Sequence, residues 1–244
     1  MFKNLKRPNA EEFFDLIMDA FAGGDRKQTK WLLKKANKRF PKHHLIPYIE
    51  GLLAVTIDDE KKGAILFKKC LTIQPEFALA HANLSICYQK SQNIPRSLLH
   101  ASLAVKYAKE DELEMVYQQQ EMLDMVEKTI PAELSLEQYI EDGLNFEQAH
   151  EYMISNNFAQ AIPLFEQVYA SDNKSSPALG NLGICYLMQK DFAQSRHYLE
   201  QALAVDPSYE LAKHTLVQLD AVEQGKESLP EQIFSMQHGQ IERV

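Results

Sequence analysis

The stretch that decides the fold is "SPALGNLGICYLMQKDFAQSRHYLEQALAVDPSY", residues 176–209. Apolar residues recur three or four positions apart in both of its halves, at Leu179, Leu182, Tyr186, Leu199 and Leu203. This spacing is typical of a helix that buries one face, and not of a strand. Because the polar turn "QKDF" separates the halves, we expect two amphipathic helices, 177–189 and 192–204, that fold back on each other as a hairpin.

Small residues in this stretch indicate how closely the two helices pack. Gly183 stands in the middle of the first helix, where a glycine costs about 1 kcal/mol relative to alanine. That cost is tolerable if the missing side chain lets the second helix approach closely at Ser195 and Ala202. The same device occurs earlier in the chain, where the equivalent positions hold Ser85, Ser97 and Ala104.

The helical pattern repeats along the chain with a period of 34 residues. Pro41 and Pro75 are one period apart, and the hexapeptide "NLSICY" at 83–88 returns as "NLGICY" at 181–186. Aligning the apolar patterns to these marks gives five units, 10–43, 44–77, 78–111, 142–175 and 176–209. A fixed period of this length predicts stacked helical hairpins, each of which buries its apolar face on its neighbours.

These units resemble the tetratricopeptide repeat. The positions that carry the resemblance in the clearest unit are Leu179, Leu182, Gly183, Tyr186, Ser195, Leu199 and Pro207. The five units together cover 170 of the 244 residues. The resemblance implies an all-α fold, a superhelical solenoid of antiparallel helical hairpins, whose first helices line a concave side that binds peptides or helices.

The two groups of units are out of phase, which predicts the domain organisation. We expect an N-terminal array of three repeats plus a capping or bridging helix over 1–128, and a connector with the start of the next helix over 129–141. A C-terminal array of two repeats plus a capping helix follows over 142–225. The tail, 226–244, has no period; we interpret it as a flexible end, the alternative being that "LPEQIFSM" docks in a groove.

The three cysteines raise the question of a metal or redox site. No C-x-x-C is present, and no cysteine and histidine have the spacing of zinc ligands. Cys87 and Cys185 stand at equivalent places in different units, and a free cysteine behaves as a small hydrophobic residue. We therefore interpret both, and Cys70, as packing residues. With no phosphate-binding loop and no nucleophile elbow, we predict no enzyme, no catalytic residue, no metal and no cofactor.

The resemblance assigns a peptide-binding groove to the first helices of the units. Its predicted lining is Phe14, Met18, Phe21, Tyr48, Leu52, Val55, Asn83, Ile86, Gln89, Lys90, Tyr117, Phe146, His150, Asn181, Ile184 and Met188. Soluble monomers seldom expose so large an apolar surface. Either a partner covers this surface, or tight winding of the chain buries much of it.

Asn83 and Asn181 match an asparagine that holds the ligand backbone in those family members that clamp a C-terminal carboxylate. The basic residues of such a clamp are missing, because Phe14, Met18, Leu79, Leu211 and Thr215 stand in their places. The groove therefore suits an apolar or amphipathic segment, held by side-chain burial and by one or two asparagines.

Charge is unevenly distributed. Residues 1–42 hold 11 basic and 5 acidic residues, a balance of +6, whereas the whole chain carries −8. Within Arg26–Lys42 there are 8 basic residues and no acidic one, and the predicted basic patch is Lys30, Lys34, Lys35, Lys38 and Arg39. Nucleic acid is the alternative partner for this helix. The acidic chain and the lack of interleaved aromatic residues favour a solvated helix or one that faces an acidic partner.

The prediction from sequence is a non-enzymatic interaction module: an adaptor, co-chaperone or assembly scaffold. We expect a protein or peptide partner, with self-association through groove or tail as a further option, and no membrane contact. No run approaches the ~18 apolar residues of a membrane span. The three cysteines do not form a disulfide framework, and no secretory signal is evident, which makes the cytoplasm the expected location.

Overall fold

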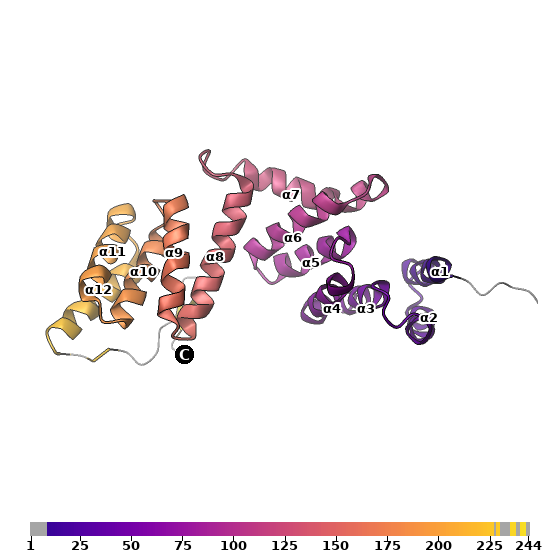
Figure 1. Cartoon of the computed structure of the whole chain (residues 1–244), viewed down its shortest axis with the longest axis horizontal. Helices are drawn as coiled ribbons and strands as arrows, with labels where there is room; N and C mark the ends of the chain where they lie inside the picture. The colour runs from indigo at the N-terminus through magenta and orange to yellow at the C-terminus, as the bar shows by residue number, and fades with distance from the viewer. Residues whose placement is uncertain (1–8, 227, 230–234, 238–239, 243–244) are drawn as a thin grey trace, which may run out of the picture. The chain divides into compact units, whose positions relative to one another are not determined.

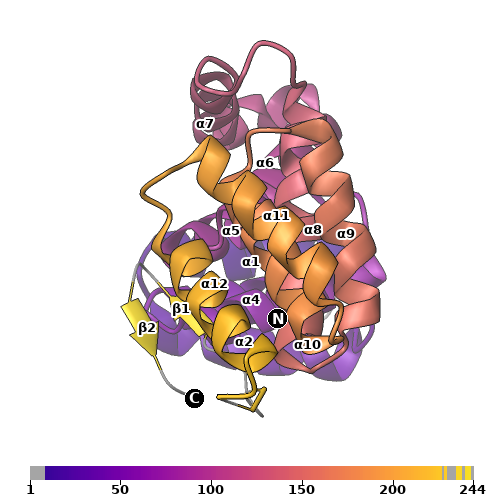
Figure 2. The ribbon, with the colours of Figure 1, turned by 90° about the vertical axis from the view of Figure 1, so that its left-hand side faces the viewer.

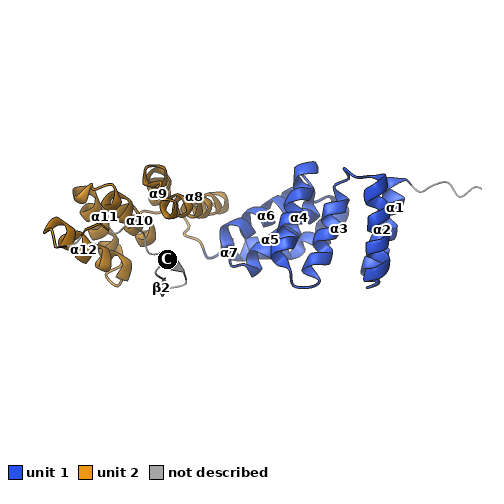
Figure 3. Cartoon of the chain, turned by 90° about the horizontal axis from the view of Figure 1, so that it is seen from below, with its two compact units in different colours: residues 1–129 blue, residues 130–244 orange. Residues whose placement is uncertain are grey.

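A computed structural model describes residues 9–226, 228–229, 235–237 and 240–242 of the chain. The chain divides into two compact units, residues 1–129 (unit 1) and 130–244 (unit 2), which are coloured separately in Figure 3. Within the described ranges the fold consists of helical hairpins (Figure 1), so the predicted all-α fold of antiparallel helical hairpins is confirmed. Two short strands, β1 (Ser235–Gln237) and β2 (Gln240–Glu242), pair antiparallel near the C-terminus (Figure 2).

Unit 1 contains three hairpins and a covering element. The hairpins are α1 (Ala10–Ala22) with α2 (Arg26–Arg39), α3 (Leu45–Val55) with α4 (Glu60–Ile73), and α5 (Ala78–Lys90) with α6 (Ile94–Tyr107). The covering element is a 3₁₀-helix, η1 (Glu110–Val116), followed by α7 (Tyr117–Glu127), which packs on α6. Unit 2 contains α8 (Leu136–Ile154) with α9 (Phe158–Ser171), α10 (Ser176–Met188) with α11 (Phe192–Val205), and α12 (Glu210–Glu223).

Every hairpin turns by means of one residue with a positive φ angle. These residues are Gly24, Asp58, Gln92, Asn156 and Lys190, with φ between 57° and 76°. Within each unit they are 34 residues apart, so the period of the sequence is also the period of a backbone conformation. A non-glycine residue in this region costs roughly 1–2 kcal/mol. In four of the five turns the residue is not glycine, so these turns carry this conformational free-energy cost.

The second helix of the hairpin is capped in the same way in most repeats. The side-chain oxygens of Asp25, Asp59, Asn93 and Asp191 each accept a hydrogen bond from the backbone N–H three residues later, at 2.9–3.1 Å. Such an N-cap satisfies one of the unpaired donors at a helix start and contributes about 1 kcal/mol. Turn and cap together explain why the hairpins recur at a fixed length.

The core of each unit lies between the helices of the hairpins and between successive hairpins. In unit 2 the Ser195 hydroxyl donates to the backbone oxygen of Gly183 at 2.8 Å, and in unit 1 Ser97 donates to the oxygen of Ser85 at 3.0 Å. A Cβ atom at Gly183 would lie 2.5 Å from Leu199 Cγ. The predicted close approach at Gly183 is therefore confirmed.

The structure differs from the sequence prediction at the ends of the arrays. The capping or bridging helix expected at the end of the first array begins as a 3₁₀-helix, and the α-helix starts only at Tyr117. In an α-helix, Glu110 and Glu114 would lie one turn apart and repel each other. In the observed 3₁₀-helix, the Glu112 side chain accepts a hydrogen bond from the backbone N–H of Lys109.

The start of unit 2 also differs in detail. Helix α8 begins at Leu136, six residues before the expected repeat boundary. Ser135 caps it by accepting from the backbone N–H of Gln138, and the Gln138 side chain donates to Asp142 and Ser171. Most of the tail lies outside the described residues. Leu229 packs against the cluster that includes Leu219.

Two histidines, the buried His81 and the half-buried His100, form a hydrogen-bonded pair in unit 1. His81 Nε2 lies 2.9 Å from the oxygen of Pro75, and since a carbonyl only accepts, Nε2 carries the hydrogen. His81 Nδ1 therefore accepts from Nδ1–H of His100, 2.9 Å away. Burial, with smaller effects from His81, Lys68 and Arg96, lowers the pKa of His100 to about 4, and burial also lowers the pKa of His81.

The pair predicts an acid-sensitive unit 1. Between pH 6.5 and about 4 the unfolded chain binds protons that the folded His100 excludes, so stability is complete above this window and falls as the pH falls through it. The loss reaches at most about 3 kcal/mol. Urea unfolding followed by Trp31 fluorescence should show this slope, and His100→Phe should flatten it. Equal slopes for wild type and variant would contradict the assignment, and the exposed His214→Gln in unit 2 serves as the control.

The Gly183 contact predicts that alanine is harmful there. Alanine favours a helix by about 1 kcal/mol, but its Cβ would overlap Leu199, and overpacking costs typically 1–3 kcal/mol. We expect Gly183→Ala to lower the free energy of unfolding of unit 2, measured by urea unfolding with far-UV circular dichroism. The exposed Glu200→Ala on α11 should change it by less than about 0.5 kcal/mol. A stabilised Gly183→Ala would refute the close-contact argument.

Candidate functional site

Unit 2 contains a cavity of about 160 Å³, which we call the unit 2 groove. Its lining comes from α8, from α10 and from the start of α12, and consists of Phe146, His150, Met153, Pro177, Asn181, Ile184, Tyr209 and Leu211. On α8 and α10 these residues are three or four positions apart, so each helix presents one face to the cavity. Four of the residues predicted from sequence, Phe146, His150, Asn181 and Ile184, lie together in this groove.

Asn181 is a polar residue in the lining of the groove. The residue is 6% exposed, and among the described residues its amide has no hydrogen-bond partner. Its amide atoms are not among the fully buried atoms that lack a partner, so the amide keeps contact with solvent. A ligand group can therefore take the place of water at this amide.

Asn83, the equivalent residue in unit 1, is in a different state. Its Nδ2 donates to the backbone oxygen of Leu79 at 2.8 Å and lies 3.3 Å from the hydroxyl oxygen of Tyr48. The position equivalent to Tyr48 in unit 2 is Phe146, which has no hydroxyl. The Tyr48 hydroxyl is thus one of two hydrogen-bond partners that Asn83 has and Asn181 lacks.

The unit 2 groove carries no formal charge at neutral pH. Burial lowers the pKa of His150, which keeps its imidazole neutral. Burial, and secondarily Asp206, raises the pKa of Tyr209 to about 12, so the phenol also stays neutral. No lysine or arginine is among the residues that line the groove. Its chemistry is therefore apolar side-chain burial around one amide.

Sequence reasoning missed Tyr209 and Pro177 as groove residues. Tyr209 enters the groove because Gly180 has no side chain: a Cβ atom at Gly180 would lie 2.6 Å from Tyr209 Cε1. The sequence contains a signal for this contact, because Gly180 is a second glycine in α10 beside Gly183. A second glycine in one helix indicates a second close contact. Met188, which was predicted, is half-buried and lies outside the groove.

In unit 1 the predicted groove residues do not form one surface. Phe14, Tyr48 and Leu52 are buried in the core, because successive hairpins close over them, and they are not available to a ligand. Half-buried positions are Met18, Phe21, Val55 and Asn83, and exposed positions are Ile86, Gln89, Lys90 and Tyr117. Lys90 forms an ion pair with Glu60.

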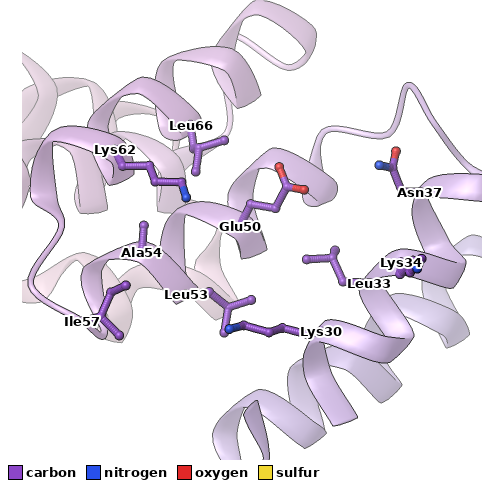
Figure 4. Close-up of a pocket in the computed structure, with 10 residues that line it drawn as sticks. All are labelled: Lys30, Leu33, Lys34, Asn37, Glu50, Leu53, Ala54, Ile57, Lys62 and Leu66. Carbon is purple, nitrogen blue, oxygen red and sulfur yellow. The ribbon is translucent and has the colours of Figure 1, made fainter. Parts of the chain in front are cut away.

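The predicted basic patch lies on α2, and its side chains point in different directions. Lys30 and Lys34 line a second cavity, between α2, α3 and α4 (Figure 4). Lys35 lies over the ring of Trp31, with Nζ 3.4 Å from the ring centroid, and Arg39 lies over Phe40. Lys38 is exposed. The charges therefore surround the helix and do not form a single flat face.

The three cysteines are free and buried. Burial raises the pKa of Cys70 and Cys185 to about 12, and burial with a smaller effect of Glu60 raises that of Cys87 to about 11. Within the described part of the chain no group of three or more His, Cys, Asp or Glu could hold a metal ion. No helix in the described ranges has the length and apolar character to span a bilayer.

The stacked hairpins and the groove along their first helices define a helical repeat protein. The sequence model of the tetratricopeptide repeat family matches residues 152–219. This segment, from the end of α8 to most of α12, belongs to that family, which confirms the predicted resemblance, and the other hairpins share its period and turn. A comparison with curated protein sequences finds no match.

Solved structures of similar fold are distant in sequence. YrrB, described as a TPR protein with an unusual peptide-binding site, is 16% identical, with 76% of this chain and 97% of that chain covered and a TM-score of 0.34. PilW, a type IV pilus biogenesis factor, is 16% identical (86% and 100% covered, TM-score 0.38). The TPR2AB-domain:pHSP90 complex of yeast Sti1 is 10% identical (88% and 84% covered, TM-score 0.37). Similarity at this level concerns the fold alone.

The burial of the cysteines predicts that they are unreactive in the folded protein. Only the thiolate attacks a disulfide reagent, and raised pKa values together with burial suppress it. We expect modification by an aromatic disulfide reagent to be at least about 100-fold slower than for free cysteine. In urea all three thiols should react. Fast modification of Cys87 or Cys185 in the folded chain would contradict the interpretation as packing residues.

Proposed function

We propose that the chain is a non-enzymatic adaptor whose unit 2 groove holds a peptide segment of a partner protein. The observation that carries the proposal is the Asn181 amide, which lines the groove, keeps contact with solvent and has no hydrogen-bond partner among the described residues. A peptide backbone offers both a donor and an acceptor, which an asparagine amide can satisfy together. On binding, these backbone groups would take the place of water at the amide.

The lining of the groove indicates the class of peptide. Phe146, Ile184 and Leu211 offer apolar surface, and no lysine or arginine is present to hold a carboxylate. We therefore expect an uncharged segment with an apolar or aromatic side chain that enters the cavity. About 160 Å³ accommodates one such side chain and not a whole helix face, so affinity would be modest and recognition would centre on one anchor residue.

Peptides selected from a random phage-displayed library on the immobilised chain provide the probe. Asn181→Ala should raise the Kd of a selected peptide about three- to tenfold, the loss of one hydrogen bond. Phe146→Tyr should act in the same direction, because it supplies the hydroxyl that Tyr48 places near Asn83 in unit 1. Isothermal titration calorimetry measures both effects.

The repeats provide matched controls. Asn83→Ala removes an asparagine from the equivalent position, so it should leave the Kd unchanged while destabilising unit 1, where its hydrogen bonds are lost. Ile184→Glu should abolish binding, and Ile86→Glu, its equivalent in unit 1, should not. Peptides that bind the Asn181 and Ile184 variants as tightly as wild type, or a library that yields no binder, would reject the proposal.

A further inference from the structure

Unit 1 separates charge between its two ends. At one end, Arg26–Lys42 holds 8 basic residues and no acidic one; at the other, Glu110–Glu127 holds 7 acidic residues and no basic one. The first segment forms α2 and the second forms η1 and α7, which Figure 3 shows at opposite ends of unit 1. The separation is a property of one compact unit, and the two ends cannot neutralise each other within it.

The basic end contains a cavity of about 500 Å³ (Figure 4). Leu33 of α2 and Leu53 of α3 form part of its apolar floor, and Lys30, Lys34 and Lys62 stand around it. Glu50 is the acidic member of the lining. It occupies a position where the repeat family usually has an apolar residue, and α2 packs on α3 less extensively than α4 packs on α5. The cavity is the space that this looser contact leaves.

The acidic end carries unpartnered apolar side chains. Leu113 and Met115 are 52% and 58% exposed, and they alternate with Glu112 and Glu114 in the sequence "EDELEMV". Their neighbour Val116 is buried, which anchors the end of the 3₁₀-helix on the unit. The result is an acidic segment with two exposed apolar side chains, complementary in charge and polarity to the cavity lined by Lys30, Lys34 and Lys62.

We propose that the acidic segment Glu110–Val116 of one copy binds the cavity between α2, α3 and α4 of a second copy. Leu113 and Met115 would enter the apolar floor, and the surrounding carboxylates would face Lys30, Lys34 and Lys62. Since the two surfaces differ, the contact is heterologous: each bound copy still offers one free end, and chains of copies form unless a ring closes. Exposed ion pairs of this kind are weakened by salt.

Sedimentation velocity tests the proposal with the full chain. Wild type should associate with increasing concentration at an ionic strength of about 0.01 M, where the Debye length is ~30 Å, and less at about 0.15 M, where it is ~8 Å. Lys30→Glu/Lys34→Glu and Asp111→Lys/Glu114→Lys should each weaken association about tenfold or more, because like charges then face each other. Mixing the two variants should restore association, since each supplies the surface that the other has lost.

A matched charge reversal separates this contact from a general effect of net charge. Lys61→Glu/Lys69→Glu changes two exposed lysines of α4 that do not line the cavity, and it should associate like wild type. A wild type that stays monomeric at low salt would overturn the proposal, as would single variants that still associate or a mixture that does not. Monomeric wild type that binds nucleic acid through α2 would assign the basic end to that partner.

Discussion

The contact on which both units depend is the close approach of the two helices within each hairpin. At Gly183 and at Ser85 a small residue lets a serine of the second helix donate its hydroxyl to a backbone oxygen of the first. This hydrogen bond satisfies a buried hydroxyl without inserting a bulky group, so the helices stay close along their length. Large side chains such as Leu199 and Phe165 then fill the space on either side. Turn, cap and small-residue contact all recur with the same period, which is why one hairpin predicts the next.

The hairpins could be predicted from sequence because everything that defines them is local. Apolar spacing, an N-cap and a turn residue lie within one period, and a single repeat contains them all. The lining of the groove could be predicted only in part, because burial depends on how successive hairpins close over each other. Phe14 has the position of a groove residue, but its ring packs against those of Phe40, at the end of α2, and His43, between α2 and α3. Tyr209 reaches the groove from a neighbouring element through the gap at Gly180.

The two asparagines show how far an identical motif can diverge in function. Asn83 and Asn181 open nearly the same hexapeptide on equivalent helices, and sequence alone treats them alike. Part of their difference arises one repeat earlier, where Tyr48 has a hydroxyl near Asn83 and Phe146 offers none to Asn181; the other part is the hydrogen bond from Asn83 to the backbone oxygen of Leu79 in its own helix. Repeat proteins couple each unit mainly to its neighbours, so a change in the preceding first helix alters the surroundings of the next one. Unit 1 uses its asparagine in internal hydrogen bonds, whereas the Asn181 amide has none among the described residues.

The charges at the two ends of unit 1 bear on how copies of the chain would stack on each other. A stack of repeats is incomplete at both ends, and an exposed apolar end face invites unselective stacking. In the proposed contact the basic α2 and the acidic η1 and α7 attract each other, whereas two copies of the same surface repel, which disfavours head-to-head contacts. Glu50 lines the cavity together with Lys30, Lys34 and Lys62. In the proposed contact, this charged residue lies beside the space that the partner surface would fill.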